Sequence, residues 1–185
     1  MELTGATGLV ASALGGRTLH SWAGVQLGKG SKEALLELVR KDVHALRRWQ
    51  QVDVLFIDEI SFIDGRLFEA LEHIASQVRS RLRFGGIQLV LSGDFLQLPP
   101  VYHASEAPCT FTFECDAWRQ CVDAIAELGI VHRQHTDPGF VRYSATLWQN
   151  CIVSLRLSSL VCVVTAVFCV SNQRAGQRSG GTHYV

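Results

Sequence analysis

The apolar positions from Thr4 to about Asn150 alternate between short continuous runs and helix-like spacings. Two runs, residues 52–57 and 87–92, consist mainly of aliphatic side chains, which favours central strands covered on both faces. Each run follows a segment with apolar residues at helical spacing, so the expected unit is helix, strand, helix, strand. This alternation is typical of an α/β fold, in which crossover helices connect the strands of a parallel sheet.

Two helices are predicted from capping residues that precede an apolar face. Ser31 begins one helix, whose face continues as a single stripe made of Leu35, Leu36, Val39, Val43 and Leu46. Asp64 begins the other, whose face is made of Leu67, Phe68, Leu71, Ile74 and Val78. Because parallel crossovers are right-handed, the carboxyl ends of both strands should share the sheet edge at which such folds bind ligands.

The composition fits one domain of an intracellular protein. The chain has 185 residues, of which 48% are hydrophobic, enough for one substantial core. Its 17 basic residues balance 17 acidic ones, so any surface that binds phosphate must be local. The cysteines form no C-x2-C pair, which argues against a zinc ribbon and indicates reduced thiols. Glu2 and the lack of a basic residue before Arg17 argue against a secretory signal.

Residues 151–170 depart from the α/β pattern because they are almost continuously apolar and about long enough to cross a bilayer. A membrane span, a buried helix or strand pair, and a tail of unrelated origin are all open. Arg156 argues against the span, because a charge is costly in hydrocarbon. Residues 171–185 are rich in Gly, Ser, Arg and Gln, a composition that predicts disorder.

The first candidate for chemistry is Asp58-Glu59, two adjacent carboxylates at the end of the strand predicted at residues 52–57. Charges at the end of a buried strand need a partner, and a magnesium ion on a nucleotide supplies one. In that reading Asp58 holds the metal, often through water, and Glu59 polarises the attacking water. The alternative is a strand that ends in a solvated acidic turn.

A second candidate segment, residues 93–101, follows the other predicted strand. A loop that senses the γ-phosphate needs a short polar group such as Gln97, and the stiff Pro99-Pro100 pair would pass on its movement. An ordinary rigid turn is the alternative, since Gly-Asp and Pro-Pro pairs are common in turns.

A third candidate lies near the amino terminus, where residues 4–8 open a short helix that closes at Gly15-Gly16. Hydroxyl and glycine residues at a helix amino terminus can hold a phosphate through backbone N–H groups. Trp22, which follows shortly after, could stack on a base. The alternative is a capped helix and a core tryptophan.

Together these segments resemble the Pif (petite integration frequency) family of ATP-dependent DNA helicases, relatives of RecD within superfamily one. The pattern T-x-x-T-G-x-x-A, then G-G-x-T-L-H-S-[FW]-A-G, occurs at residues 4–24, and D-E-I-S occurs at residues 58–61. F-G-G-I-Q-L-V-L-[ST]-G-D-F-x-Q-L-P-P-V occurs at residues 84–101. Farther on, F-E, A-W and R-Q pairs follow in the family's order, with His132 where an aromatic residue is usual.

The resemblance implies a RecA-like P-loop NTPase domain that uses Mg²⁺ and ATP as cofactors. Asp58 and Glu59 would serve Mg-ATP, with Asp58 as the metal ligand, and Gln97 would couple hydrolysis to strand movement. Arg133 matches an arginine that reaches the γ-phosphate, as an arginine finger does, although a surface salt bridge is equally open for it. The implied contacts with single-stranded DNA fall on Thr4, Thr7, Gly8, Thr18, His20 and Ser21.

The resemblance further implies 5'-to-3' unwinding in DNA repair, recombination and telomere maintenance, in the nucleus, the mitochondrion or both. The partners would be single-stranded DNA and ATP, without a membrane, and the chain would be monomeric. A non-catalytic fragment that binds single-stranded DNA or a protein partner is the alternative function. A membrane anchor on a degenerate ATPase domain is a third.

The sequence departs from the family at two places. The phosphate loop, G-x-x-G-x-G-K-[ST], should precede Thr4, and the pattern occurs nowhere in the 185 residues, so we expect weak or no ATP turnover by this chain alone. The match fades after Tyr143. We therefore expect a partial first RecA-like domain at residues 1–143, truncated at the phosphate loop, an unmatched apolar segment at 144–170 and a disordered tail at 171–185, as in a truncated or alternatively spliced product.

Overall fold

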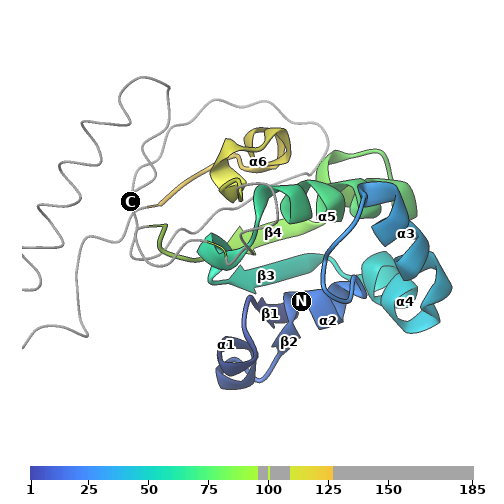
Figure 1. Cartoon of the computed structure of the whole chain (residues 1–185), viewed down its shortest axis with the longest axis horizontal. Coiled ribbons are helices and arrows are strands. Elements are labelled where there is room, and N and C mark those ends of the chain that lie inside the picture. The colour runs from blue at the N-terminus through green and yellow to red at the C-terminus, as the bar shows by residue number, and fades with distance from the viewer. Residues whose placement is uncertain (96–99, 101–108, 127–185) are drawn as a thin grey trace, which may run out of the picture.

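The computed structural model describes residues 1–95, 100 and 109–126, and it shows a parallel sheet flanked by helices (Figure 1). The sheet has four strands in the order β2-β1-β3-β4, and all neighbouring pairs are parallel. The predicted α/β fold with a parallel sheet is therefore confirmed. The strands are β1 (Glu2–Gly5), β2 (Arg17–Thr18), β3 (Val54–Asp58) and β4 (Gln88–Leu91).

The two predicted strands are β3 and β4, and their centres are buried, with Leu55, Ile57 and Leu91 fully inaccessible to solvent. The other two strands were not predicted. The segment that we expected to open a helix at Thr4 instead begins as β1, in which Thr4 pairs with Ile57. The helix itself, α1 (Gly8–Ala13), starts later, after its capping residue Thr7.

The single helix predicted after Ser31 is two helices, α3 (Lys32–Lys41) and α4 (Val43–Gln51). Asp42 separates them because its backbone is extended and its carboxylate accepts the N–H groups of His44 and Ala45, which caps α4. The break turns Val43 away from the core, where it is 62% exposed. The prediction of one continuous apolar stripe was therefore wrong beyond Val39.

The helix predicted after Asp64 is α5 (Gly65–Val78), and the apolar face named for it packs inward. Between α5 and β4 lies the short turn η2 (Arg83–Gly86), whose Phe84 is buried against Phe68. Nearer the amino terminus, α2 (Leu19–Ala23) directly follows β2 and packs on α4. The core therefore joins helices from both halves of the described chain.

Trp22 of α2 belongs to this core and does not face a base. Its side chain is fully buried, and its ring centroid lies 4.7 Å from that of Trp49. The Trp49 indole N–H donates to the Ala23 carbonyl at 2.9 Å. The core reading of Trp22 is thus confirmed, and the base-stacking reading is wrong.

The remaining elements are η1 (Ile60–Phe62), directly after β3, and η3 (Thr112–Glu114) with α6 (Asp116–Cys121), which pack against α5 (Figure 1). Across residues 1–95, 100 and 109–126, no helix has the length and apolar character needed to cross a membrane. Residues 151–170, for which a span was one alternative, lie outside the described residues, as do the predicted domain boundaries at 143 and 170.

Candidate nucleotide and nucleic-acid site

The three segments singled out by sequence meet at one edge of the sheet. Asp58 ends β3 and pairs with Gly5, the last residue of β1, and Gly5 also pairs with Thr18, the last residue of β2. The Ala6 N–H donates to the Asp58 carbonyl at 3.0 Å, which extends the contact past the strands. Ser92 follows β4 at the same edge. The acid pair and both candidate DNA segments therefore share the carboxyl edge, where ligands bind in such folds.

The turn after β3 gives the two carboxylates different surroundings. Glu59 has a left-handed backbone, with φ 58° and ψ 46°, which turns the chain sharply away from the strand. Its N–H donates to Oδ1 of Asp58 at 3.0 Å, and the Ser92 hydroxyl donates to the same oxygen. Both groups fix the Asp58 carboxylate and leave its Oδ2 oxygen without a hydrogen bond from any described residue. This strained turn is typical of a functional site.

Backbone contacts join the ends of β3 and β4. The Ile60 N–H donates to the Ser92 carbonyl at 2.9 Å, and the Ser92 N–H donates to the Ile57 carbonyl at 3.0 Å. Gly93 packs so closely on this turn that a Cβ there would lie 2.9 Å from the Ile60 nitrogen. The turn that carries the acid pair and the start of segment 93–101 therefore form one unit.

Phe95, near the start of segment 93–101, belongs to an aromatic cluster. The Phe95 ring makes edge contacts with Phe111, Phe113 and Trp118, at centroid distances of 6.2, 5.0 and 5.9 Å. The first part of the segment is thus fixed to η3 and α6. Gln97 and Arg133, the other two predicted catalytic residues, lie outside the described residues, so their roles stay predictions.

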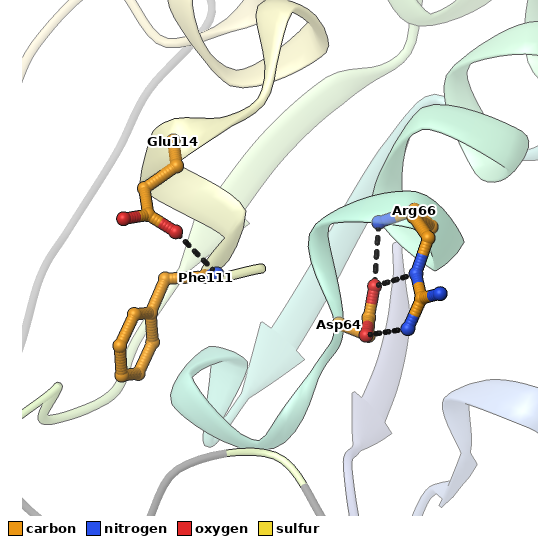
Figure 2. Close-up of polar contacts among 4 residues, drawn as sticks. All are labelled: Asp64, Arg66, Phe111 and Glu114. Carbon is orange, nitrogen blue, oxygen red and sulfur yellow. Dashed lines mark hydrogen bonds and ion pairs between the residues drawn. The ribbon is translucent and has the colours of Figure 1, made fainter. Parts of the chain in front are cut away.

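The start of η3 and the amino terminus of α5 each carry polar contacts of their own, Phe111 with Glu114 and Asp64 with Arg66 (Figure 2). Asp64 caps α5 by accepting the Arg66 N–H at 2.8 Å, and its carboxylate also pairs with the Arg66 guanidinium at 2.9 Å. Burial alone would raise the pKa of Asp64, but these bonds to Arg66 outweigh it and lower the pKa. The Phe111 N–H donates to the Glu114 carboxylate at 2.9 Å, and Gly65 N–H reaches the Thr110 carbonyl.

Of the three DNA contacts predicted near the end of β1, Thr4 has a structural role, whereas Thr7 and Gly8 are accessible to solvent. The Thr4 side chain is fully buried and donates to the Phe56 carbonyl at 2.7 Å, so it ties β1 to β3. The expectation that Thr4 contacts DNA is therefore corrected, because no part of it reaches solvent. Thr7 is partly exposed and caps α1 through the Val10 N–H, and Gly8 is exposed.

Thr18, His20 and Ser21 border one hollow of about 400 Å³ on the surface of α2. Thr18 caps α2 by accepting the Ser21 N–H at 3.3 Å, and Ser21 is exposed. Burial lowers the pKa of His20 from its ordinary value, so its ring is neutral at pH 7. His20 therefore offers a flat neutral ring and not a positive charge.

Arg48 of α4 is a site residue that sequence reasoning missed. Its Nε donates to the Trp22 carbonyl at 2.7 Å, and its Nη2 donates to the Ser21 carbonyl at 3.1 Å. These bonds satisfy the end of α2 and put a cation beside the predicted DNA segment. The only sequence signal was the Arg-Arg pair before Trp49, which gives no hint of its partner 26 residues earlier.

The donors at Asp58 and Glu59 fit a magnesium ion that is shared with a nucleotide. Mg²⁺ binds carboxylate oxygen and usually keeps several waters or phosphate oxygens, so one or two protein carboxylates suffice. The Asp58 Oδ2 oxygen has the chemistry for that contact. Within the part of the chain that the structure describes, no three His, Cys, Asp or Glu side chains gather as a metal cage.

A parallel sheet with an acid pair at its carboxyl edge, and a second motif fixed to the next strand, fits the RecA-like class of nucleotide-binding domains. The sequence model of PIF1-like helicases matches residues 2–156, most of the chain. The chain therefore belongs to the PIF1-like helicase family.

Individual relatives agree with this assignment. The chain is 44% identical over 142 residues to the ATP-dependent DNA helicase PIF1 of Saccharomyces cerevisiae, covering 76% of this chain and 16% of that protein. It is 41% identical over 132 residues to the human protein of the same name, covering 71% of this chain and 20% of that protein. The chain thus spans about a fifth or less of the length of these relatives.

Solved structures also match. The crystal structure of Pif1 helicase from Candida albicans superposes with a TM-score of 0.72 at 41% identity, covering 79% of this chain and 33% of that one. Pif1 helicase from Bacteroides, in complex with ADP-AlF3 and single-stranded DNA, superposes with a TM-score of 0.60 at 27% identity, covering 80% and 36%. The predicted RecA-like architecture is therefore confirmed.

Proposed function

We propose that this chain forms part of an ATP-driven DNA helicase, in which the carboxyl edge of the sheet binds Mg-ATP beside single-stranded DNA. The observation that carries the proposal is the convergence of Asp58-Glu59 with the Thr18 and Gly5 strand ends at one edge. The Pif1 relative solved with ADP-AlF3 and single-stranded DNA supports both ligand classes.

At the nucleotide, Asp58 would hold Mg²⁺ through Oδ2 while the Ser92 hydroxyl and the Glu59 N–H keep Oδ1 fixed. The metal, when bound, neutralises charge on the transferred phosphoryl group. Glu59 would orient and polarise the attacking water from the sharp turn at φ 58°. Gln97 would sense the γ-phosphate, and Arg133 would stabilise charge on the phosphoryl oxygens as they separate.

At the nucleic acid, Thr7 and Gly8 would contact the strand at the amino terminus of α1, and Thr18, His20 and Ser21 would contact it at α2. The neutral His20 ring suits stacking on a base, and stacking would let a chain with no net charge bind DNA. Because Ala6 is hydrogen-bonded to Asp58, a change at the metal ligand reaches the DNA segment through one backbone contact.

In the cell we propose 5'-to-3' unwinding that serves DNA repair, recombination and telomere maintenance, in the nucleus or the mitochondrion, by a monomeric protein. Family membership supports these roles. The 185-residue chain and a chain that ends at residue 150 can be compared without detergent. If both are soluble and monomeric, the result supports the monomer and contradicts a membrane anchor.

The first experiment measures ATP hydrolysis and DNA binding by the 185-residue chain in parallel. Glu59→Gln, which keeps the size of the side chain and removes its charge, controls for contaminating motor enzymes. Ser21→Glu, at an exposed position, tests the DNA segment by placing a negative charge against the phosphates. We expect single-stranded DNA binding that Ser21→Glu weakens at least about tenfold, by repulsion and lost contact.

For hydrolysis we expect no turnover above that of Glu59→Gln, because the phosphate-loop pattern is missing from the 185 residues. DNA-stimulated turnover that Glu59→Gln abolishes would mean that another group takes over the role of the phosphate loop. DNA binding without hydrolysis also fits the second candidate, a non-catalytic fragment that binds single-stranded DNA, which the missing loop pattern favours. Absence of DNA binding would contradict both.

A further inference from the structure

The hollow at α2 extends beyond the residues that the family motif identifies. Besides Thr18, His20 and Ser21, it is lined by Gly24, Gln26, Leu38 and Asp42. Its volume of about 400 Å³ lies in the range of small-molecule sites, about 300–1,000 Å³. Nothing in the nucleotide chemistry at the sheet edge uses these four additional residues.

Asp42 gives the hollow a free acceptor. Its Oδ1 oxygen accepts the His44 and Ala45 N–H groups at 2.9 and 3.1 Å, and its Oδ2 accepts no hydrogen bond from a described residue. Those two N–H bonds, that of Ala45 first, and the neighbouring Arg48 keep the pKa of Asp42 low despite some opposing desolvation. The hollow therefore presents a negatively charged oxygen at neutral pH, which repels a phosphate group and attracts an amino group.

The loop beside Asp42 has a left-handed backbone at two positions, Gly24 and Gln26. Gly24 has a left-handed backbone at φ 75°, and a Cβ there would lie 2.5 Å from the Ala45 Cβ and 3.7 Å from Asp42 Oδ2. Gln26 also has a left-handed backbone, φ 54°, although its side chain makes that conformation strained. An exposed Gln26 amide at the mouth of the hollow can both donate and accept hydrogen bonds.

The remaining walls suit a flat ring. Leu38 supplies apolar contact, and the neutral ring of His20 supplies a stacking surface. A flat ring could stack on His20, place an amino group at Asp42 and direct its other edge to Gln26. Such a ring would use every kind of group that the hollow offers.

We propose that this hollow is a subsite for one nucleobase of the bound DNA strand, and that Asp42 and Gln26 favour bases with an exocyclic amino group. The inference rests on the proposed binding of single-stranded DNA at Thr18, His20 and Ser21. Cytosine and thymine are the best pair of bases for testing this preference, because they are alike in size and stacking. Cytosine presents an N4 amino donor to the carboxylate, whereas thymine presents the O4 acceptor.

The test is fluorescence anisotropy of the 185-residue chain with labelled oligo-dC and oligo-dT of equal length, at fixed salt. We expect the wild-type chain to bind oligo-dC about fivefold more tightly, as one hydrogen bond to a charged acceptor implies. In Asp42→Asn the ratio should fall to about one, because an amide can turn its NH₂ group to thymine O4. Asparagine also caps helices, so α4 should be retained.

Glu37→Gln is the matched control. It removes one negative charge from α3, at an exposed carboxylate that pairs with Arg40 at 2.9 Å and does not line the hollow. This variant should bind both oligonucleotides slightly more tightly and keep the fivefold ratio. Gln26→Asn, which tolerates the left-handed backbone but shortens the side chain, should lower the affinity for oligo-dC.

The outcomes separate the subsite from DNA binding itself. A wild-type ratio near one, or a ratio that Asp42→Asn leaves unchanged, overturns the subsite while Ser21→Glu still weakens binding. Equal changes in the ratio for Asp42→Asn and Glu37→Gln also overturn it, because they would reflect net charge alone. A chain that binds neither oligonucleotide overturns the subsite together with the proposed function.

Discussion

At the scale of single residues, a polar side chain within a nucleic-acid motif can serve the fold and not the ligand. Thr4 and Thr18 occupy comparable motif positions, yet Thr4 is fully buried and Thr18 borders the surface hollow. The difference arises because β1 lies between β2 and β3, whereas β2 is the outer strand on that side of the described sheet. A central strand buries its hydroxyl, and the hydroxyl then needs an internal acceptor.

Thr4→Val tests this structural role. Valine keeps the shape of threonine but cannot donate to the Phe56 carbonyl, so the free energy of unfolding should fall by about 1 kcal/mol. The affinity of the folded chain for single-stranded DNA should not change. Urea unfolding and anisotropy on the same samples measure both, with Thr4→Ser as the variant that keeps the hydroxyl. A large loss of DNA affinity at unchanged stability would restore Thr4 to the binding site.

His20 predicts a pH dependence of stability. Because burial lowers the folded-state pKa of His20 below about 6.5, the unfolded chain binds a proton more readily than the folded chain. The contribution of neutral His20 is thus complete above pH 6.5 and decreases as pH falls toward the folded-state pKa. We expect His20→Gln to reduce the loss of Tm between pH 7.5 and 5.5, measured by thermal melts.

The wild-type chain, melted at both pH values beside His20→Gln, is the reference for that measurement. If His20→Gln and wild type lose Tm equally over this pH range, burial does not hold His20 neutral, and its assignment as a stacking ring fails with it.

At the scale of elements, the sequence predicted what long patterns determine. The apolar runs at β3 and β4 and the face of α5 repeat over enough residues to identify both element and orientation. The strands β1 and β2 were missed because they contain Gly, Thr or Arg in place of an apolar run. The break between α3 and α4 was missed because the capping bonds of Asp42 outweigh an apolar spacing that continues past it.

The junction of α5 with η3 gives a prediction at this scale. Alanine normally stabilises a helix relative to glycine by about 0.5–1 kcal/mol. At Gly65, however, a Cβ would lie 2.9 Å from the Phe111 carbonyl and 3.2 Å from that of Thr110. Backbone atoms cannot move as easily as side chains, so Gly65→Ala should destabilise the fold by about 1–3 kcal/mol.

Gly8→Ala is the matched substitution, since Gly8 also begins a helix but a Cβ there has no neighbour within 4 Å. It should leave stability unchanged or raise it slightly. Urea unfolding of both variants measures the contrast. Equal stability of the two would mean that the chain at Thr110 and Phe111 is not held against α5.

At the scale of the whole molecule, the candidate site depends on contacts between segments far apart in sequence, which explains what sequence reasoning could and could not provide. Asp58 and Glu59 were predicted from a local pattern, and Ser21 from the resemblance to the helicase family. Their common edge followed from the parallel topology. The bonds from Arg48 to Ser21 and from Ser92 to Asp58 span 27 and 34 residues, and no local pattern encodes such pairs.

The Ser92 bond joins the acid pair to segment 93–101, so its removal should loosen both together. Ser92→Ala takes away the hydroxyl that fixes Asp58 Oδ1 but leaves the backbone bonds of Ser92 in place. A hydrogen bond to a charged group contributes about 1.5–3 kcal/mol, and its partly buried position favours the lower end. We expect faster hydrogen exchange at the amides of Glu59 and Ile60, by about tenfold, and near wild-type exchange in Ser92→Thr. Unchanged exchange in Ser92→Ala would show that the backbone contacts alone hold the two motifs together.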